Sequence, residues 1–436
     1  MLRSGFFRDV AIVAGGSALA QALTMAFAPI ITRLYGADAF GVQGVFMATL
    51  AVFVPLSNLT YNVAIVLAPS DNEARALFKL SILIGLAVAL VSAAVVGVFH
   101  EAIAEAIGFN AGSMLLFLVP VVLFLSASVQ PLQQWLIRQK QFRAISRTTV
   151  LEAGILGSSK AAAGFVLATA PVLVVLSSLG SIVSALLLWI SARPTLLSRS
   201  SAADETSETG EVAKPVSLRQ VAKKYGDFPL YRAPQVWLNS LSHNVPLLML
   251  AALIGPAAAG FYAIARAVLG LPSSLISRAV GTVFLPRIVE ANSRSESLRR
   301  LIFSSTAGLA VAGLIPFGVL VAAGPWLFSF VFGAEWVVAG EYARWLALWL
   351  YFMFMNVPSV QAIPLLGLQG HLLVYEIVFI TLRMGALAFG IVVVQSDLVA
   401  IGLFSMFGVV ANICLIGWVL IRCDAGGRDG IAPETT

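Results

Sequence analysis

The sequence predicts an all-α integral membrane protein with twelve transmembrane helices in two six-helix lobes and both termini cytoplasmic. First, 59% of the 436 residues are hydrophobic and only 11% are charged, whereas soluble proteins carry about 25% charged residues. Second, the apolar residues form runs of about 20 residues, the length of helix that crosses a bilayer. Third, one glycine motif recurs at matching positions in the two halves. Because open backbone cannot face lipid, helices are the expected form of these runs.

Twelve apolar runs meet this length. The first follows a basic start and resembles a signal peptide, but it is too long and more runs follow, so we interpret it as the first span. The fifth and sixth runs are separated only by Ala170 and Pro171, which predicts a tight hairpin. The runs cover residues 10–31, 41–66, 77–99, 114–135, 150–170, 172–192, 228–254, 257–283, 301–323, 341–364, 373–394 and 398–420.

The distribution of Lys and Arg predicts the orientation of these spans, because the cytoplasmic loops of membrane proteins are enriched in both residues. With a cytoplasmic N-terminus and alternating spans, most of the 27 basic residues fall in cytoplasmic segments, and Arg33 is the one in an outer segment. A wrong span count would scramble this alternation. The net charge of +6 and the pI of about 9.5 therefore indicate basic cytoplasmic loops rather than a nucleic-acid partner.

One long polar segment divides the chain. Residues 193–226 are rich in Ser, Thr and Glu and end in a basic stretch. This composition predicts a flexible cytoplasmic linker followed by a short amphipathic helix on the membrane surface. The predicted domains are an N-terminal six-helix lobe over 1–192, this linker, a C-terminal six-helix lobe over 227–422 and a cytoplasmic tail over 423–436.

The recurring motif is G-x-x-A-x-G. It joins span 1 to span 2 at residues 36–41 and span 7 to span 8 at residues 255–260, and each preceding span carries a proline near its end, Pro29 and Pro246. Glycine permits a tight turn and a close approach of helices. The matching positions predict two halves related by a parallel internal repeat.

Four segments resemble bacterial polysaccharide exporters and O-antigen flippases, a family of the multidrug/oligosaccharidyl-lipid/polysaccharide (MOP) superfamily. They are ITRLYGADAFGVQGVF (31–46), NVAIVLAPSDNEA (62–74), QQWLIRQKQFRAIS (133–146) and GFYAIARAVLGLPSSLISRAVGTVFLPRI (260–288), and the resemblance covers nearly the whole chain. It implies two lobes of helices around a central cavity. It also implies movement of a lipid-linked oligosaccharide, usually on undecaprenyl pyrophosphate, from the cytoplasmic to the periplasmic leaflet of the bacterial inner membrane.

Such cargo has a polar, anionic headgroup, so its path needs cations and hydrogen-bonding groups, and charged residues within spans usually face such a path. Lys160 and Arg383 lie near the middle of spans 5 and 11. The structural alternative for Lys160 is packing through the small residues of 154–164, and for Arg383 it is an ion pair with Glu376 seven residues earlier.

Two further arginines are candidates for the cavity. Arg266 lies in the outer half of span 8, before a kink expected at Pro272, and we interpret it as lining the cavity. Arg232, near the cytoplasmic end of span 7, either lines the cavity, as the family implies for this span, or extends to the lipid headgroups. Arg344 follows Glu341 by three residues, which favours a local ion pair.

Uncharged polar residues cluster in two spans. Span 2 has Asn58 and Asn62 one turn apart in SNLTYN, and span 7 has Asn239 and His243 in NSLSHN. Hydrogen bonding between helices is the structural alternative, but the family implies that these spans line the cavity, which favours contacts with sugar. His243 is also a candidate proton-coupling group.

These features favour a monomeric flippase for lipid-linked oligosaccharide that works by rocking of its two lobes, with membrane lipid and polysaccharide polymerase or export machinery as candidate partners. The alternatives are a multidrug or lipid II-type exporter of the same superfamily, and a membrane glycosyltransferase or polymerase. Spans 1 to 4 contain no Asp or Glu, which counts against the cation coupling of drug exporters. The outer segments are short, the longest near 100–113 and 324–340, which counts against an enzyme.

The sequence contains no nucleotide-binding glycine loop, metal-ligand cluster or catalytic triad. We therefore expect no cofactor and no direct use of ATP. The two cysteines, Cys414 and Cys423, fall in an apolar run and in the polar tail, and they predict no disulfide framework.

Overall fold

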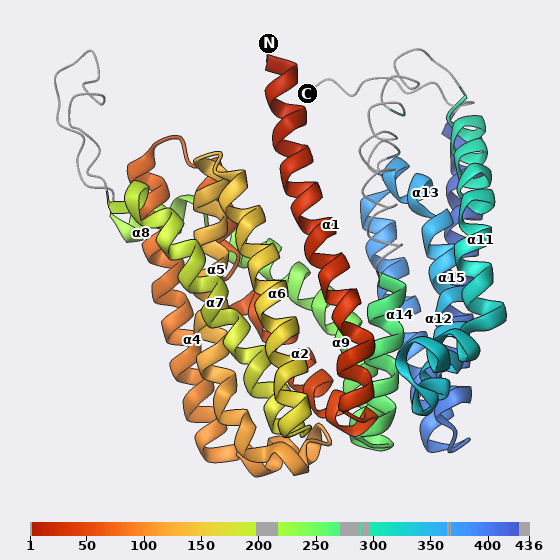
Figure 1. Ribbon diagram of the computed structural model, residues 1–436. Helices are drawn as coiled ribbons and strands as arrows, with labels where there is room; N and C mark the ends of the chain where they lie inside the picture. Colours follow the sequence, from red (N-terminus) through yellow and green to blue (C-terminus); the bar gives the residue numbers. More distant parts are fainter. Residues whose placement is uncertain are drawn as a thin grey trace. The chain divides into compact units, whose positions relative to one another are not determined.

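The computed structural model describes residues 2–197, 217–270, 288, 297–363, 366 and 368–426, which form helices and short connections with no β-strand among them (Figure 1). The chain divides into two compact units, residues 1–259 and 260–436. Most of the predicted linker (198–216), the kink expected at Pro272 and the tail beyond 426 lie outside the described residues.

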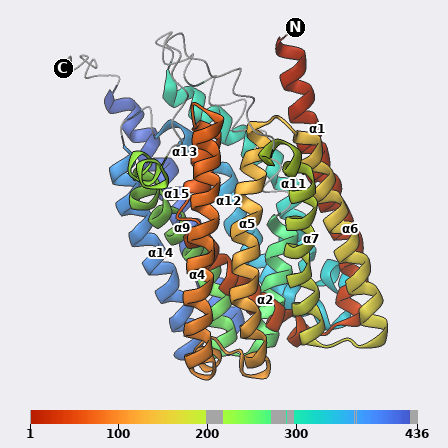
Figure 2. The same cartoon turned by 90° about the vertical axis from the view of Figure 1, so that its left-hand side faces the viewer.

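Unit 1 is a bundle of long helices. Figures 1 and 2 show α4, α5, α6 and α7 running side by side. Within the bundle, α6 packs against α1 and α7, α5 packs against α4 and α7, and α2 packs against α5, α7 and α9. The elements are α1 (Leu2–Leu34), α2 (Ala37–Ser57), α3 (Tyr61–Leu67), α4 (Asp71–Ala106), η1 (Asn110–Phe117), α5 (Leu118–Arg138), α6 (Phe142–Val166), α7 (Ala170–Leu197), α8 (Leu218–Lys224), η2 (Phe228–Arg232) and α9 (Ala233–Leu253).

Unit 2 is built around α12. This helix packs against α11 and α15, and α14 packs against α15 on its other side. Gly324 and Gly340 allow the α11–α12 contact, since a Cβ on Gly340 would lie 2.4 Å from Pro325 Cα. The elements are α11 (Leu298–Phe332), η3 (Ala334–Trp336), α12 (Val337–Met355), α13 (Val357–Ala362), α14 (Gln369–Val392) and α15 (Asp397–Gly426). A further helical segment over 256–270 crosses the boundary between the units.

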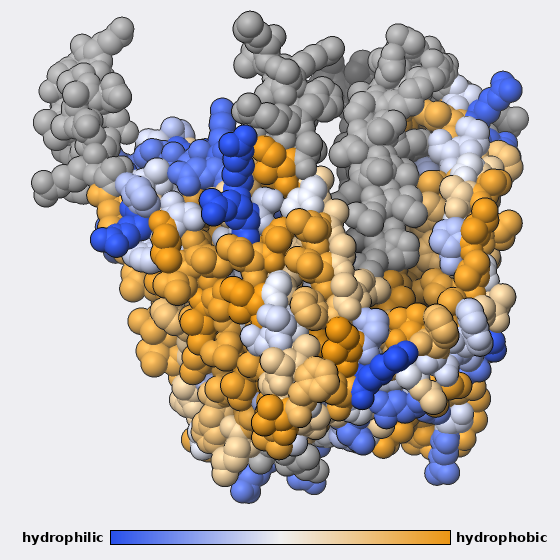
Figure 3. Space-filling view, in the orientation of Figure 1, coloured by the Kyte–Doolittle hydropathy of each residue, from blue (hydrophilic) through white to orange (hydrophobic). Residues whose placement is uncertain are grey.

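Nine helices in the described residues are long and apolar enough to cross a membrane, and α6 and α12 are not among them. The multi-pass membrane protein predicted from composition is therefore confirmed, while the count of twelve spans and the cytoplasmic termini stay predictions. On the face in Figure 3, hydrophobic side chains cover the long helices of unit 1, and hydrophilic ones gather toward the end that carries α8.

The structure corrects one predicted span and two predicted outer segments. The run over 41–66 was expected to be one helix, but α2 ends at Ser57 and α3 begins at Tyr61. Leu59 and Thr60 between them have φ of 45° and 57°, a left-handed conformation that side chains with a Cβ seldom adopt. Apolarity alone does not report such a break, so the continuous helix predicted here is wrong.

The second correction concerns the outer segments. Residues 100–113 and 324–340 were expected to be loops, but α11 continues to Phe332, and η1 and η3 lie in these segments. At Phe99, the last residue of the predicted third span, the backbone is not helical (φ −118°, ψ 17°), so α4 kinks there, and a short helical stretch then extends to Ala106. The residues of HEAIAEA in this stretch are mostly strong helix formers.

The two copies of the glycine motif form turns between helices and contact each other. The first lies where α1 ends and α2 begins, and the second follows α9, with Gly255 at a positive φ of 137°. A Cβ on Gly41 would lie 1.7 Å from the carbonyl oxygen of Pro256. Glycine at this position is therefore required by the close approach of the backbone, as the motif predicts.

Candidate functional site

One face of the helical segment formed by η2 and α9 carries polar side chains that are exposed on unit 1. Arg232, Asn239 and His243 follow one another at spacings of seven and four residues, which places them within roughly 40° of arc at 100° per residue. All three are exposed. Gln235 is also exposed, one turn before Asn239. It was not among the predicted residues, although its spacing of four residues from Asn239 was a visible signal. We call these four residues the polar stripe.

The neighbouring face of α9 packs on α2 and fixes the direction of the polar stripe. Ser240 Oγ donates a hydrogen bond to the carbonyl oxygen of Ala51 on α2, at 2.6 Å, and Leu247 and Ala251 are buried on the same side. Arg232 lies near the end of the predicted span, where a long side chain can also reach the lipid headgroups. Asn239 and His243 lie further into the span, where ionisable side chains usually face the protein interior or a cavity, which favours a polar surrounding for this part of the stripe.

The break between α2 and α3 holds buried polar groups that lack partners. Asn58 is 1% exposed, and neither its amide nitrogen nor its amide oxygen has a hydrogen-bond partner among the described residues. Asn62 Nδ2 donates to Gln130 Oε1 on α5, at 3.1 Å, but Asn62 Oδ1 has no partner there, and neither does the buried Ser81 Oγ on α4. A Cβ on Gly85, one turn after Ser81, would lie 3.6 Å from Asn58 Oδ1.

These orphaned atoms indicate a polar site rather than ordinary packing. Each buried polar atom without a partner costs about 1–3 kcal/mol, and broken transmembrane helices commonly place such groups at binding sites. The break also adjoins the start of the polar stripe, because Thr60 Oγ1 donates to the carbonyl oxygen of Phe228 in η2, at 3.0 Å. Hydrogen bonding between helices therefore accounts for Asn62 Nδ2 but leaves Asn58 unexplained.

Lys160 lies apart from these two polar sets, on α6. Its side chain is half-buried, and its carbonyl oxygen accepts a hydrogen bond from the Tyr35 hydroxyl at 3.1 Å. The small residues around it pack on α1, since a Cβ on Gly157 would lie 2.2 Å from Phe27 and one on Gly164 would lie 2.7 Å from Tyr35. The predicted packing is confirmed at Gly157 and Gly164 but not at Gly154, where an added Cβ would meet nothing within 4 Å, and a contact between Lys160 and cargo stays a prediction.

Arg383, in unit 2, is held by aromatic rings. Its guanidinium carbon lies 3.9 Å from the ring centroid of Trp349 and 4.0 Å from that of Phe404. Its Nε donates to the Phe404 carbonyl oxygen at 3.3 Å. No ion pair joins it to Glu376 in the described part of unit 2, so that alternative is wrong. Desolvated cation–π contacts are worth about 2 kcal/mol, so the two rings stabilise the guanidinium in this position, and a contact between Arg383 and cargo stays a prediction.

Of the remaining candidate arginines, one stays a candidate for the cavity and the other forms a local ion pair. Arg266 is half-buried, one turn after the buried Tyr262, and its role in a cavity stays a prediction. The local pair of Arg344 is confirmed, with Nη1 at 3.1 Å from Glu341 Oε2. One acidic residue inside a predicted span was missed: Glu152 on α6 accepts a hydrogen bond from Ser184 on α7.

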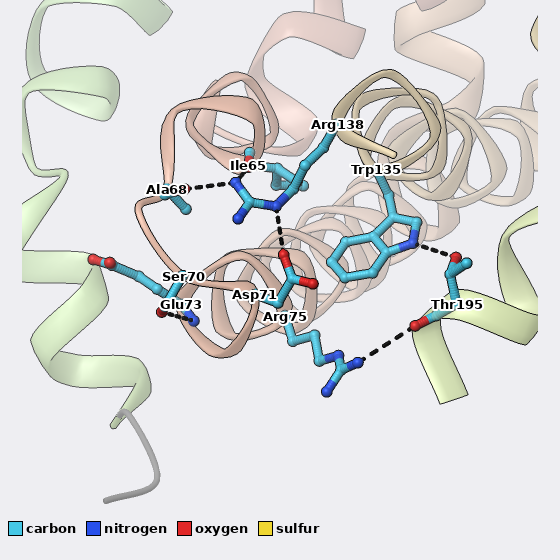
Figure 4. Close-up of polar contacts among 9 residues, drawn as sticks. All are labelled: Ile65, Ala68, Ser70, Asp71, Glu73, Arg75, Trp135, Arg138 and Thr195. Atoms are coloured by element: carbon cyan, nitrogen blue, oxygen red, sulfur yellow. Dashed lines mark hydrogen bonds and ion pairs between the residues drawn. The ribbon is translucent and has the colours of Figure 1, made fainter. Parts of the chain in front are cut away.

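Two of the segments that carry the family resemblance meet at one end of unit 1. Arg138 at the end of α5 points toward the connection between α3 and α4 (Figure 4), where its Nε lies 2.9 Å from Asp71 Oδ1 and its Nη1 lies 2.5 Å from the Ala68 carbonyl oxygen. Beside it, Trp135 Nε1 donates to Thr195 Oγ1 on α7, at 2.9 Å. These contacts hold α3, α4, α5 and α7 together, so the residues that carry this part of the family resemblance have a structural role.

The short helix α8 is fixed over the same end. Lys224 Nζ lies 2.5 Å from Glu73 Oε1 on α4, and this hydrogen bond raises the pKa of Lys224 above its ordinary value of 10.5. The Tyr61 hydroxyl donates to the Ala222 carbonyl oxygen at 3.1 Å. The predicted short basic helix is confirmed, and its place on the membrane surface stays a prediction.

Within the described ranges, no three metal-ligating side chains lie close enough together to hold a metal ion.

A family model described as "Polysaccharide biosynthesis protein" matches residues 30–341. The chain belongs to the polysaccharide biosynthesis protein family. This match extends over more than half of the chain and over both units, and it confirms the resemblance drawn from the sequence. A comparison with curated protein sequences gives no match.

Solved structures of transporters share the fold of this polysaccharide biosynthesis protein. An inward-facing multidrug resistance MATE family transporter of the MOP superfamily matches with a TM-score of 0.68 at 13% identity, covering 94% of this chain and 96% of that one. The lipid II flippase MurJ matches with a TM-score of 0.60 at 13% identity, covering 96% of this chain and 90% of that one. The fold is therefore that of MATE and MurJ transporters.

Proposed function

We propose that this polysaccharide biosynthesis protein is a flippase that moves a lipid-linked oligosaccharide repeat unit, carried on undecaprenyl pyrophosphate, across the bacterial inner membrane. The single observation that carries the proposal is the polar stripe of α9, in a family of polysaccharide biosynthesis and on a transporter fold. An arginine, two amides and an imidazole in a line supply a cation for pyrophosphate and hydrogen-bonding groups for sugar.

The proposed mechanism is alternating access. Two six-helix lobes, residues 1–192 and 227–422, rock about a central cavity, and the linker over 193–226 and the tail over 423–436 lie with both termini in the cytoplasm. Twelve spans surround the path, and one copy of the chain suffices because both lobes belong to it. The headgroup then crosses in contact with polar groups while its isoprenoid chain stays in lipid, which avoids the cost of charge in hydrocarbon.

The proposed cargo contacts fall in two sets. Arg232, Asn239 and His243 in the polar stripe meet the headgroup first, and Asn58 and Asn62 at the break supply further hydrogen-bonding groups. Lys160, Arg266 and Arg383 are proposed as cations along the rest of the path. His243 is also the proposed group for coupling to protons, since its ordinary pKa lies near neutral pH.

The test is complementation in a host from which the gene is deleted. Deletion should abolish the surface polymer and leave its lipid-linked repeat unit on the cytoplasmic face, and the wild-type gene should restore both. Arg232→Ala should restore polymer at least about tenfold less well, the loss expected for one charged hydrogen bond. Arg219→Ala on α8 is the matched control, since it removes an exposed arginine outside the stripe, and it should restore polymer fully.

Other outcomes would redirect the assignment. Normal polymer in the deletion strain would overturn the proposal for that glycan and would favour the multidrug or lipid II-type exporter, whose fold this chain shares. Loss of polymer without accumulation of the repeat unit would favour a glycosyltransferase or polymerase. Equal restoration by Arg232→Ala and Arg219→Ala would remove the polar stripe from the transport path.

A further inference from the structure

Two adjoining cavities lie between helices at one end of unit 1, away from α9. The larger, of about 650 Å³, lies between the start of α6, the end of α7 and Ile12 of α1. The smaller, of about 540 Å³, lies beside the last turns of α7. Ile190 lines both, so the two hollows adjoin at this residue, and we call them together the α6–α7 cavity.

One end of the α6–α7 cavity is strongly basic. Lys140, Arg143 and Arg147 line the larger part, and Arg193 lines the smaller part. All four are exposed, and within the described residues none has an ion-pair partner. No Asp or Glu is among the described residues that line either part. The hollow therefore concentrates four positive charges, and none of its described lining residues carries the opposite charge.

The other end of the α6–α7 cavity is apolar. Leu151 lies roughly 12 Å further along the α6 axis than Arg143, and Leu187 lies roughly 9 Å along α7 from Arg193, at 1.5 Å per residue. Both leucines line the cavity, and Trp189 and Ile190 add exposed apolar surface on α7. The cavity thus changes from cationic to apolar along the axes of α6 and α7.

The apolar end opens toward the lipid-facing surface of unit 1. On α7, Leu179, Ile182 and Leu186 form an exposed strip at spacings of three and four residues that leads to Ile190. On α6, Ile155 continues the exposed line of Leu151. Such contiguous exposed apolar strips on membrane helices are surfaces for lipid chains, so a molecule in the cavity can extend its chains along α6 and α7.

The start of α6 adds to the attraction for an anion. Gln141 at its N-cap makes no side-chain capping hydrogen bond, and no acidic residue lies in the first turn. The N-terminal end of a helix carries a partial positive charge, and here nothing on the helix neutralises it. This effect supports the charge of the four basic side chains and does not replace it.

We propose that the α6–α7 cavity is a binding site for an anionic phospholipid of the surrounding membrane. The phosphate lies among Arg143, Arg147 and Arg193, and the acyl chains lie against Leu151, Leu187 and the exposed strip of α7. Basic pockets between transmembrane helices are known to bind anionic headgroups. The site shares no residue with the proposed cargo contacts, because neither the polar stripe nor Asn58, Asn62 or Lys160 lines the cavity.

The experiment compares lipid binding to the full chain in detergent by native mass spectrometry. Phosphatidylglycerol and phosphatidylcholine with the same acyl chains are titrated against wild type, an Arg143→Gln/Arg147→Gln variant and an Arg219→Gln/Lys223→Gln variant. The last removes two exposed cations of α8, outside the cavity. Glycerol 3-phosphate, a soluble phosphate monoester without acyl chains, is the competitor that distinguishes a lipid site from a site for soluble phosphate.

Wild type should bind its first phosphatidylglycerol at least about 25-fold more tightly than phosphatidylcholine, since each basic residue near an anionic headgroup contributes about fivefold. The cavity variant should lose about 25-fold for phosphatidylglycerol and nothing for phosphatidylcholine, and the α8 variant should stay within about twofold of wild type. Equal losses in the two variants would indicate general surface attraction and overturn the site. Full competition by glycerol 3-phosphate would also overturn it.

A second measurement needs no variant. Phosphatidylglycerol with a photoreactive acyl chain, incorporated with the wild-type chain into phosphatidylcholine nanodiscs, should label peptides from residues 142–151 and 187–197. Labelling confined to other helices would overturn the proposal even if the cavity variant did not fold. The variant's melting temperature in lipid-free detergent should match wild type, since both arginines are exposed.

Discussion

The contact between the two glycine motifs makes Gly41 the position where one methyl group should cost the most. The substitution is Gly41→Ala. A Cβ built on this residue lies 1.7 Å from the carbonyl oxygen of Pro256 and 2.4 Å from its carbonyl carbon. Ordinary van der Waals contacts of a Cβ lie at 3.4–4 Å. The start of α2 and the turn after α9 must therefore separate by about 1.5–2 Å, because neither partner is a side chain that can rotate away.

The expected cost follows from this displacement. Overfilling a packed interior typically costs about 1–3 kcal/mol, and more when backbone must move. We expect Gly41→Ala to lower the free energy of unfolding by about 3 kcal/mol. The control is Gly154→Ala on α6, where an added Cβ meets nothing within 4 Å. That variant should be unchanged or more stable by up to about 1 kcal/mol, since alanine favours helix over glycine.

The assay is unfolding of both variants and wild type in one detergent, by reversible titration with a denaturing detergent and by thermal melting. Tryptophan fluorescence and circular dichroism report tertiary and helical structure separately. If Gly41→Ala and Gly154→Ala unfold within about 0.5 kcal/mol of each other, a difference too small for any steric overlap, the close approach of the two motifs does not exist. A loss of tertiary signal in Gly41→Ala with helix content retained would locate the damage in packing.

Three further substitutions test the polar contacts of unit 1. Arg138→Met should lower the free energy of unfolding by about 2–3 kcal/mol, because it leaves Asp71 and two carbonyl oxygens without their charged donor; thermal melting checks it, and a neutral result would contradict it. Asn58→Leu should raise stability by about 1–3 kcal/mol by removing two buried polar atoms without partners, and it should impair complementation if the break serves transport; greater stability with full transport would assign the break to structure. Lys224→Met tests the pair with Glu73: the pair raises the pKa of Lys224 above 10.5, so its stabilisation is fully present below pH 10.5 and is lost as pH rises past the raised pKa. Melting curves should therefore show wild type above Lys224→Met at pH 8 and a smaller gap at pH 11, and a gap independent of pH would contradict this reading.

The polar stripe shows how far spacing alone can predict a site. Arg232, Asn239 and His243 were selected as polar residues in one span, and their helical spacing already placed them on one face. The same helical spacing also includes Gln235, which was not among the predicted residues. The break between α2 and α3 was different: Asn58 and Asn62 were selected, but a continuous helix was expected, because the residues around them are as apolar as the rest of the run.

Some residues received their meaning only from distant partners. Arg383 was expected to face cargo or pair with Glu376; the ion pair does not form, and the two aromatic rings from α12 and α15 that hold the guanidinium were not predicted. Arg138 was one of several basic residues in a cytoplasmic segment until its contacts with Asp71 and Ala68 were visible. A helical pattern gives the direction of a side chain on its own helix, but it does not give the helix that meets it.

The sequence by itself determined that the chain is a multi-pass helical membrane protein of a polysaccharide family, because run length, charge content and short motifs are local properties that the bilayer constrains directly. It also determined the glycine turns, because close helix approach leaves few alternatives to glycine. Only the tertiary structure decided where α2 breaks, which polar atoms remain without partners, and that the basic ends of α6 and α7 enclose a cavity. Each of these three features depends on contacts between side chains of helices that are far apart in sequence. The sequence of a single helix does not specify those contacts, because they arise when the helices pack together.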